Sequence, residues 1–209
     1  MSRPATRSPS RTSAGGGIRR ETLAKVVTEV SGPAIVVMAG LVIVASRNAS
    51  HGAGAAWGAV AVVLCAGVPM AYVARGVKTG KWSDHHVPDR RQRHTPLLVG
   101  LVCIATAGVL LSVVRAPREL IALVLSQLVG LIVVMIVTRF WKISVHSSAS
   151  GGLVGILVAI YGLWAVLGVL PLALVAWSRT VLDAHTWPQV LVGAAAGATV
   201  ALTVFPLLR

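Results

Sequence analysis

The sequence predicts an all-α fold, a polytopic transmembrane bundle of about six to seven membrane helices, each needing roughly 18–20 apolar residues. Hydrophobic residues make up 56% of its 209 residues and charged residues only 12%, and the mean hydropathy is +0.81. Soluble domains carry about 25% charged residues. The apolar runs are continuous, rich in Ala, Leu, Val and Gly, and show no alternation with period two. Membrane strands are therefore disfavoured.

The chain begins with a polar segment and continues as one long apolar region. Residues 1–20 are rich in Ser, Arg, Gly and Pro, which predicts a disordered basic N-terminal tail. Electrostatic contact of this tail with the inner leaflet and a passive solvated tail both remain open. Residues 21–209 are predicted to form a single membrane-embedded helical domain.

Hydrophobic runs and prolines place the individual helices. The first is predicted over residues 21–46, with a kink at Pro33. The third begins at Pro96, in keeping with the preference of proline for a first helical turn. Five helices are predicted in all outside the region discussed next, over residues 21–46, 55–75, 96–114, 119–140 and 186–207.

Residues 149–177 fit two different structures. As one helix they would cross the membrane once, which would put His146 and His185 on opposite faces. As a hairpin that breaks near Tyr161 and Gly162 they would return to the side they left. With the hairpin, most of the 19 lysines and arginines share one face, which the positive-inside rule makes cytoplasmic. Because the single helix would move few of these charges, charge alone does not decide between them.

The net charge of +13 also needs an explanation. In an apolar chain we expect this positive charge to contact anionic lipid headgroups and to bind an anionic substrate. We expect no nucleic acid as partner. Cys65 and Cys103 lie inside apolar runs and are expected to pack there. His85 and His86 could suggest a metal cluster, but adjacent histidines are poorly placed to bind one ion on a helix. No metal and no cofactor are therefore predicted.

Polar residues gather in three segments between the apolar runs, at residues 78–93, 142–148 and 178–189. Arginine suits bidentate binding of phosphate oxygens, and helix N-termini add partial positive charge. One histidine can attack phosphorus while a second protonates the leaving oxygen, because imidazole titrates near neutral pH. The three segments together suit hydrolysis of a phosphate ester at a membrane surface.

The third polar segment resembles a family motif. Ser178-Arg179, five residues, His185, three residues and Gln189 is similar to the Ser-Arg-x5-His-x3-Asp motif of the type 2 phosphatidic acid phosphatase superfamily. These are the integral-membrane relatives of the vanadium haloperoxidases. Gln189 stands where the family has Asp.

The other two motifs of that family are matched only in part. Ser144 and His146 keep the Ser and His of Pro-Ser-Gly-His, while its Pro and Gly are replaced. Arg93 corresponds to the Arg of Lys-x6-Arg-Pro, but His94 follows it and His86 takes the Lys position. The resemblance covers residues 76–193, and the order of the three motifs adds to its specificity.

The resemblance implies roles for individual residues. His185 would be the nucleophile that forms a phosphohistidine, and His146 would be the general acid. Family members need no metal, and a helical hairpin joins their second and third motifs. The candidate phosphate-binding residues are Arg179, Arg93, Lys142, Ser144, Ser178 and Arg90.

Gln189 leaves two functions open for the protein. The family Asp orients the nucleophilic His and stabilises its charged form, whereas Gln can fix only the tautomer. Gln189 can also complete a capping box with Thr186, and the two roles are compatible. The resemblance implies a lipid phosphatase for a polyprenyl, isoprenoid or phospholipid phosphate or diphosphate. The positive-inside rule predicts that it acts at the cytoplasmic face of a bacterial-type inner or cell membrane. The alternative is a weak or inactive relative that binds lipid phosphates or a membrane partner.

Overall fold

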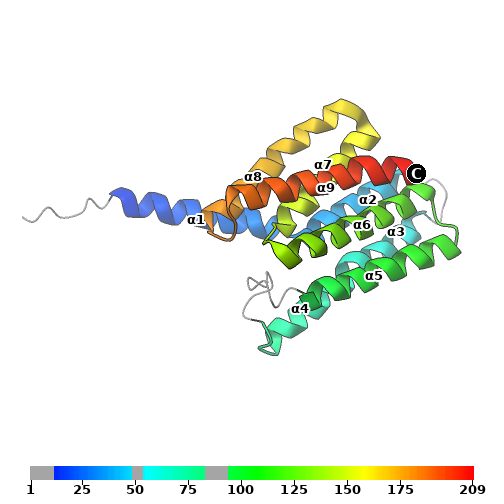
Figure 1. The fold of residues 1–209 in the computed structure, drawn as a ribbon, viewed down its shortest axis with the longest axis horizontal. Coiled ribbons are helices and arrows are strands. Elements are labelled where there is room, and N and C mark those ends of the chain that lie inside the picture. The colour runs from blue at the N-terminus through cyan, green and yellow to red at the C-terminus, as the bar shows by residue number, and fades with distance from the viewer. Residues whose placement is uncertain (1–11, 49–53, 83–93) are drawn as a thin grey trace, which may run out of the picture.

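The computed structural model describes residues 12–48, 54–82 and 94–209, and every element in these ranges is helical. Five helices are long and apolar enough to cross a membrane, or up to six if one bent pair counts as a single span. Most of them lie side by side along one long axis (Figure 1). The prediction of an all-α fold with membrane-length helices is confirmed at this level.

The N-terminal region forms two helices, α1 (Thr12–Val30) and α2 (Pro33–Arg47), where one kinked helix was predicted. They meet at an angle of 46°, because Pro33 lacks the N–H that would continue the helix. α1 already begins at Thr12, so the structure gives residues 12–20 of the predicted tail as helix. Extending an existing helix by one residue is far easier than nucleating a new one, so α1 grows through this polar stretch.

The predicted second helix is continuous but not uniform. α3 (Gly54–Val62), a π-helical segment (Val63–Gly67) and α4 (Val68–Lys78) form one rod of 25 residues. Pro69 lies at the start of α4. The wider π turn before it accommodates a ring that would clash with a carbonyl in a regular α-helix.

Two helices at nearly the predicted positions complete the core. α5 (His94–Val113) and α6 (Arg118–Phe140) are joined by a tight turn in which Arg115 has a φ of 53°. Their buried side chains pack with those of α2 and with the helix that ends the chain. The largest fully buried apolar side chains are Leu41, Leu111, Leu120, Ile143 and Phe205.

Residues 145–181 form a hairpin, as one of the two interpretations predicted. α7 (Val145–Tyr161) ends at Gly162, whose φ of 74° suits a residue without a side chain. A 3₁₀ segment (Gly162–Gly168) turns the chain, and α8 (Val169–Val181) returns towards the end where α7 began (Figure 1). The single crossing helix is therefore wrong.

α9 (Trp187–Leu208) packs on α7 with backbone against backbone. A Cβ atom added at Gly151 would collide with the carbonyl of Ala194, and one added at Gly197 with the carbonyl of Ser148. Small residues permit such close approach between apolar helices. This packing brings the first turns of α7 and α9 together.

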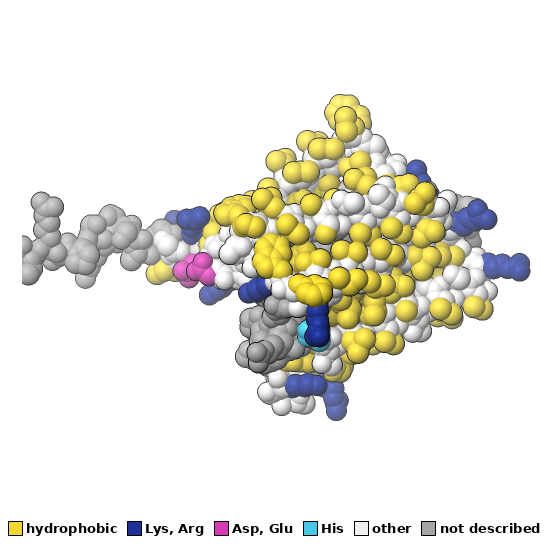
Figure 2. Space-filling view, in the orientation of Figure 1, with side chains coloured by type: hydrophobic (Ala, Val, Ile, Leu, Met, Phe, Trp, Pro, Cys, Tyr) yellow, Lys and Arg dark blue, Asp and Glu magenta, His cyan; other side chains and the backbone are white. Residues whose placement is uncertain are grey.

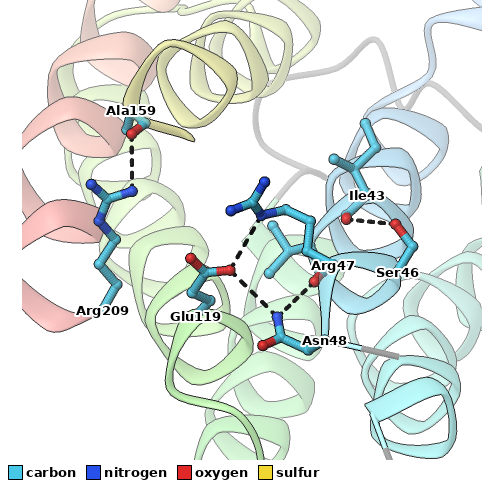
Figure 3. A network of polar contacts seen from close by, with 8 residues as sticks. Ile43, Ser46, Arg47, Asn48, Glu119, Ala159 and Arg209 are labelled. Carbon is cyan, nitrogen blue, oxygen red and sulfur yellow. Dashed lines mark hydrogen bonds and ion pairs between the residues drawn. The ribbon is translucent and has the colours of Figure 1, made fainter. Parts of the chain in front are cut away.

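Charged side chains lie at both ends of the bundle, and hydrophobic side chains cover the middle of the face in Figure 2. We call the end with residues 142–148 and 178–189 the motif end. At the opposite end, Arg47 Nε lies 3.4 Å from Glu119 Oε2, and Arg209 Nη1 donates to the carbonyl of Ala159 at 2.9 Å. Figure 3 shows this set, here called the distal network: Arg47, Asn48, Glu119 and Arg209.

Candidate active site

The turn between α8 and α9 explains the spacing from Arg179 to His185. α8 ends at Val181 with Leu182 as its C-cap, and Asp183 adopts a φ of 50°, which Asp tolerates better than most residues. The backbone N–H groups of Ala184 and His185 both donate to the carbonyl of Arg179, each at 3.1 Å. Five intervening residues therefore close a turn that returns His185 to the end of α8.

Gln189 holds the ring of His185 and caps α9 at the same time. Its Oε1 lies 3.1 Å from His185 Nδ1 and accepts from the backbone N–H of Thr186 at 3.2 Å. Because a backbone N–H can only donate, the oxygen of the amide must face this site. His185 Nδ1 therefore donates, and Nε2 keeps its lone pair. Both roles considered for Gln189 are present, including the capping box with Thr186.

Arg179 is buried and reaches across to α1. Its Nη1 donates to Thr28 Oγ1 at 3.4 Å, and Thr28 in turn donates to Ser178 Oγ at 3.1 Å. Ser178 Oγ donates to the carbonyl of Val175 at 2.8 Å. The Ser178 hydroxyl, predicted to bind phosphate, is thus engaged within the protein, and α1 contributes a contact to Arg179.

His146 follows closely on Ser144, the residue that caps the start of α7. Ser144 is the N-cap residue, and its hydroxyl accepts from the backbone N–H and the hydroxyl of Ser147, at 3.3 and 3.0 Å. Its own N–H donates to the carbonyl of Gln189 at 3.2 Å. Ser144 therefore joins α7 to α9, while His146 lies buried in the first turn of α7.

His146, Arg179 and His185 line one cavity of about 410 Å³. Glu29 adds an exposed carboxylate to its lining, and most of the remaining wall is apolar and comes from α2, the π-helical segment, α4 to α7 and α9. The hairpin and the close packing of α7 on α9 explain why residues far apart in sequence meet here.

The other predicted site residues fall into two groups. Lys142, Ser144, Ser178 and Gln189 are not among the described residues that line the cavity. Lys142 is half-buried beyond the end of α6. Arg90 and Arg93 lie outside the described residues, as do His85 and His86. Among the described residues, no group of three or more metal-ligating side chains is gathered at one point.

Two features of the cavity, a buried arginine and a helix N-terminus, favour an anion, while the exposed Glu29 in its lining carries the opposite charge. Arg179 is buried, and a charge in such surroundings interacts more strongly than it would in water. His146 lies in the first turn of α7, where backbone N–H groups and the helix dipole carry partial positive charge. A phosphate beside Arg179 and the start of α7 would meet positive potential from both.

Two residues near the cavity escaped the sequence analysis for different reasons. Gln127 lies in the middle of α6, lines the cavity, and has a buried Oε1 that accepts no hydrogen bond within the described ranges. A glutamine inside an apolar run is a signal that could have been used. Thr28 gave no such signal, because a threonine is common on any helix and its partners lie 150 residues away.

The chain matches no protein-family model, no curated protein and no solved structure. We therefore infer function from the residues that line the cavity and from the motifs.

Proposed function

We propose that this protein is a membrane lipid phosphatase that works through a phosphohistidine intermediate. The observation that carries the proposal is that His146, Arg179 and His185 line the same apolar cavity. A headgroup phosphate and an apolar chain can then be bound side by side, which suits a lipid phosphate better than a soluble ester.

The residues divide the reaction between them. His185 Nε2 attacks phosphorus while the bond from phosphorus to the lipid oxygen breaks, and His146 gives its proton to that leaving oxygen. Arg179 stabilises the charge on the phosphoryl oxygens. Water then attacks the phosphohistidine and gives its proton to His146, which releases inorganic phosphate and restores His185.

We also propose a family for the protein and a location for its active site in the membrane. The hairpin between His146 and Arg179 supports membership in the type 2 phosphatidic acid phosphatase superfamily, whose second and third motifs such a hairpin joins. We infer six to seven helices in the membrane. We also place the motif end at the cytoplasmic face of a bacterial-type inner or cell membrane, because basic residues gather there.

Release of phosphate tests the proposal. Purified protein in lipid nanodiscs should release inorganic phosphate from isoprenoid or phospholipid phosphates. His185→Ala should lower the rate by about 10⁴-fold or more, as expected when a nucleophile is removed. The matched control is His94→Ala, because His94 begins α5 and does not line the cavity. Equal inactivity of the wild type and both variants on all of these lipids would reject the proposal.

Gln189 favours a second candidate, a weak or inactive relative that binds lipid phosphates. Its neutral amide fixes the tautomer of His185 but stabilises the imidazolium less than a carboxylate would. Gln189→Glu keeps the length of the side chain and adds the charge, and Gln189→Asp restores the family residue. A gain of about tenfold or more in rate would identify a weakened enzyme. Binding of lipid phosphate without turnover in the wild type and both variants would identify a binder.

A further inference from the structure

The cavity extends deep into the bundle. Its lining includes His146 in the first turn of α7 and Ile156 further along the same helix. Ten residues of α-helix span about 15 Å. This is about half of the roughly 30 Å hydrocarbon core of a bilayer. The cavity therefore reaches about 15 Å into the bundle from the motif end, a depth comparable with half of a bilayer core.

The size of the cavity limits what can fill it. An apolar cavity of about 150 Å³ holds one benzene ring. By the same measure, 410 Å³ has room for roughly sixteen carbon atoms. Two long acyl chains would need about twice that volume. Left empty, the apolar walls would lose van der Waals contacts over their whole length.

We propose that the cavity binds a single apolar chain of a lipid phosphate whose phosphate lies at His146, Arg179 and His185. This inference rests on the proposed function and narrows its substrate. Lipid phosphates with one slender alkyl or isoprenoid chain are preferred over diacyl phospholipids, because the second acyl chain would have to remain outside the bundle.

Two glycines lie in the cavity wall, and a larger side chain at either position would shorten the cavity. A Cβ added at Gly100 on α5 would lie 3.6 Å from Leu131 Cδ2, and one at Gly130 on α6 would lie 3.9 Å from Val200 Cγ1. Both distances are ordinary contacts, so a Cβ at either position strikes no backbone atom, and we expect a leucine there to take up cavity volume. The same change also removes a helix-weakening glycine.

The ratio of two turnover rates tests the inference. Phosphate release from hexadecyl phosphate and octyl phosphate is measured in nanodiscs of one lipid composition, where partitioning is the same for every variant. The wild type should prefer the hexadecyl chain. Gly100→Leu and Gly130→Leu should each lower the hexadecyl-to-octyl ratio by about tenfold or more, since one misplaced methylene in an apolar pocket has at least that effect.

The control is Gly17→Leu on α1, because Gly17 lies outside the cavity and has nothing within 4 Å of an added Cβ. Its ratio should equal that of the wild type. Unchanged ratios in both cavity variants would overturn the inference. So would faster turnover of phosphatidate than of hexadecyl phosphate by the wild type.

A labelling experiment keeps the inference testable if the wild type releases no phosphate at all, which would reject the proposed function alone. Hexadecyl phosphate with a photoreactive diazirine at the end of its chain is irradiated with wild-type protein. Labels at Ile104, Leu123 or Ile156 would support a buried chain, because all three line the cavity. Labels confined to exposed positions such as Val102 and Ile136 would overturn it.

Discussion

The two ends of the bundle carry similar residues but use them differently. At the distal network, Arg47 and Glu119 pair at 3.4 Å with side chains that are 38% and 26% exposed. At the motif end, Arg179, His146 and His185 are buried and line a cavity. An exposed ion pair contributes little free energy, whereas a buried cation strongly favours a nearby anion.

This difference teaches that composition alone does not locate a site in a membrane bundle. Arginines lie at both ends, yet those of the distal network contact helix carbonyls and a surface carboxylate. Arg179 instead donates a hydrogen bond to Thr28 on a second helix, α1, and lines an apolar cavity.

The largest effect is expected for Arg179→Ala compared with Arg47→Ala. Loss of the buried guanidinium should lower kcat/KM for a lipid phosphate by about 10³-fold, the scale on which an arginine stabilises a phosphoryl transition state. Arg47→Ala removes the same group from the distal network and should leave kcat/KM within about twofold of the wild type. Steady-state phosphate release measures both values, and equal losses in the two variants would contradict the comparison.

A smaller effect is expected for Thr28→Val, which removes the hydroxyl that contacts Arg179 and Ser178 but keeps the shape of the side chain. We expect KM to rise about tenfold with little change in kcat, because a hydrogen bond to a charged group contributes about 1.5–3 kcal/mol. Thr28 would then be a positioning residue that acts through Arg179. The split between KM and kcat separates this role from a general loss of folded protein.

Two further variants control this experiment. Thr28→Ser keeps the hydroxyl and should restore a KM near that of the wild type. Thr22→Val makes the same change on the same helix, where Thr22 is exposed and donates only to the carbonyl of Ile18. If Thr28→Ser behaves like Thr28→Val, the hydroxyl has no part in holding Arg179.

Local patterns in the sequence predicted the parts of the fold that depend on neighbouring residues. Tyr161 and Gly162 marked the hairpin, and Pro33 marked a break that proved sharper than a kink. The capping box of Thr186 and Gln189 could also be read directly, since its partners lie three residues apart.

The remaining features depend on contacts that no local pattern records. Thr28 meets Ser178 across 150 residues, so only the packing of α1 on α8 reveals the contact. The cavity likewise arises where helices meet, and no local pattern predicts its depth. The contacts of Ser144 were likewise not predicted: this motif residue, expected to bind phosphate, caps α7 and joins it to α9.

The smallest effect is expected at the distal network itself. Glu119→Ala should lower the free energy of unfolding by at most about 1 kcal/mol, because its pair with Arg47 is partly exposed. Thermal unfolding at low and high salt measures the difference from the wild type, which should shrink as salt screens the pair. The double variant with Arg47→Ala isolates the interaction. A coupling energy well above 1 kcal/mol, or a loss of phosphate release in Glu119→Ala, would show that the distal network does more than secure helix ends.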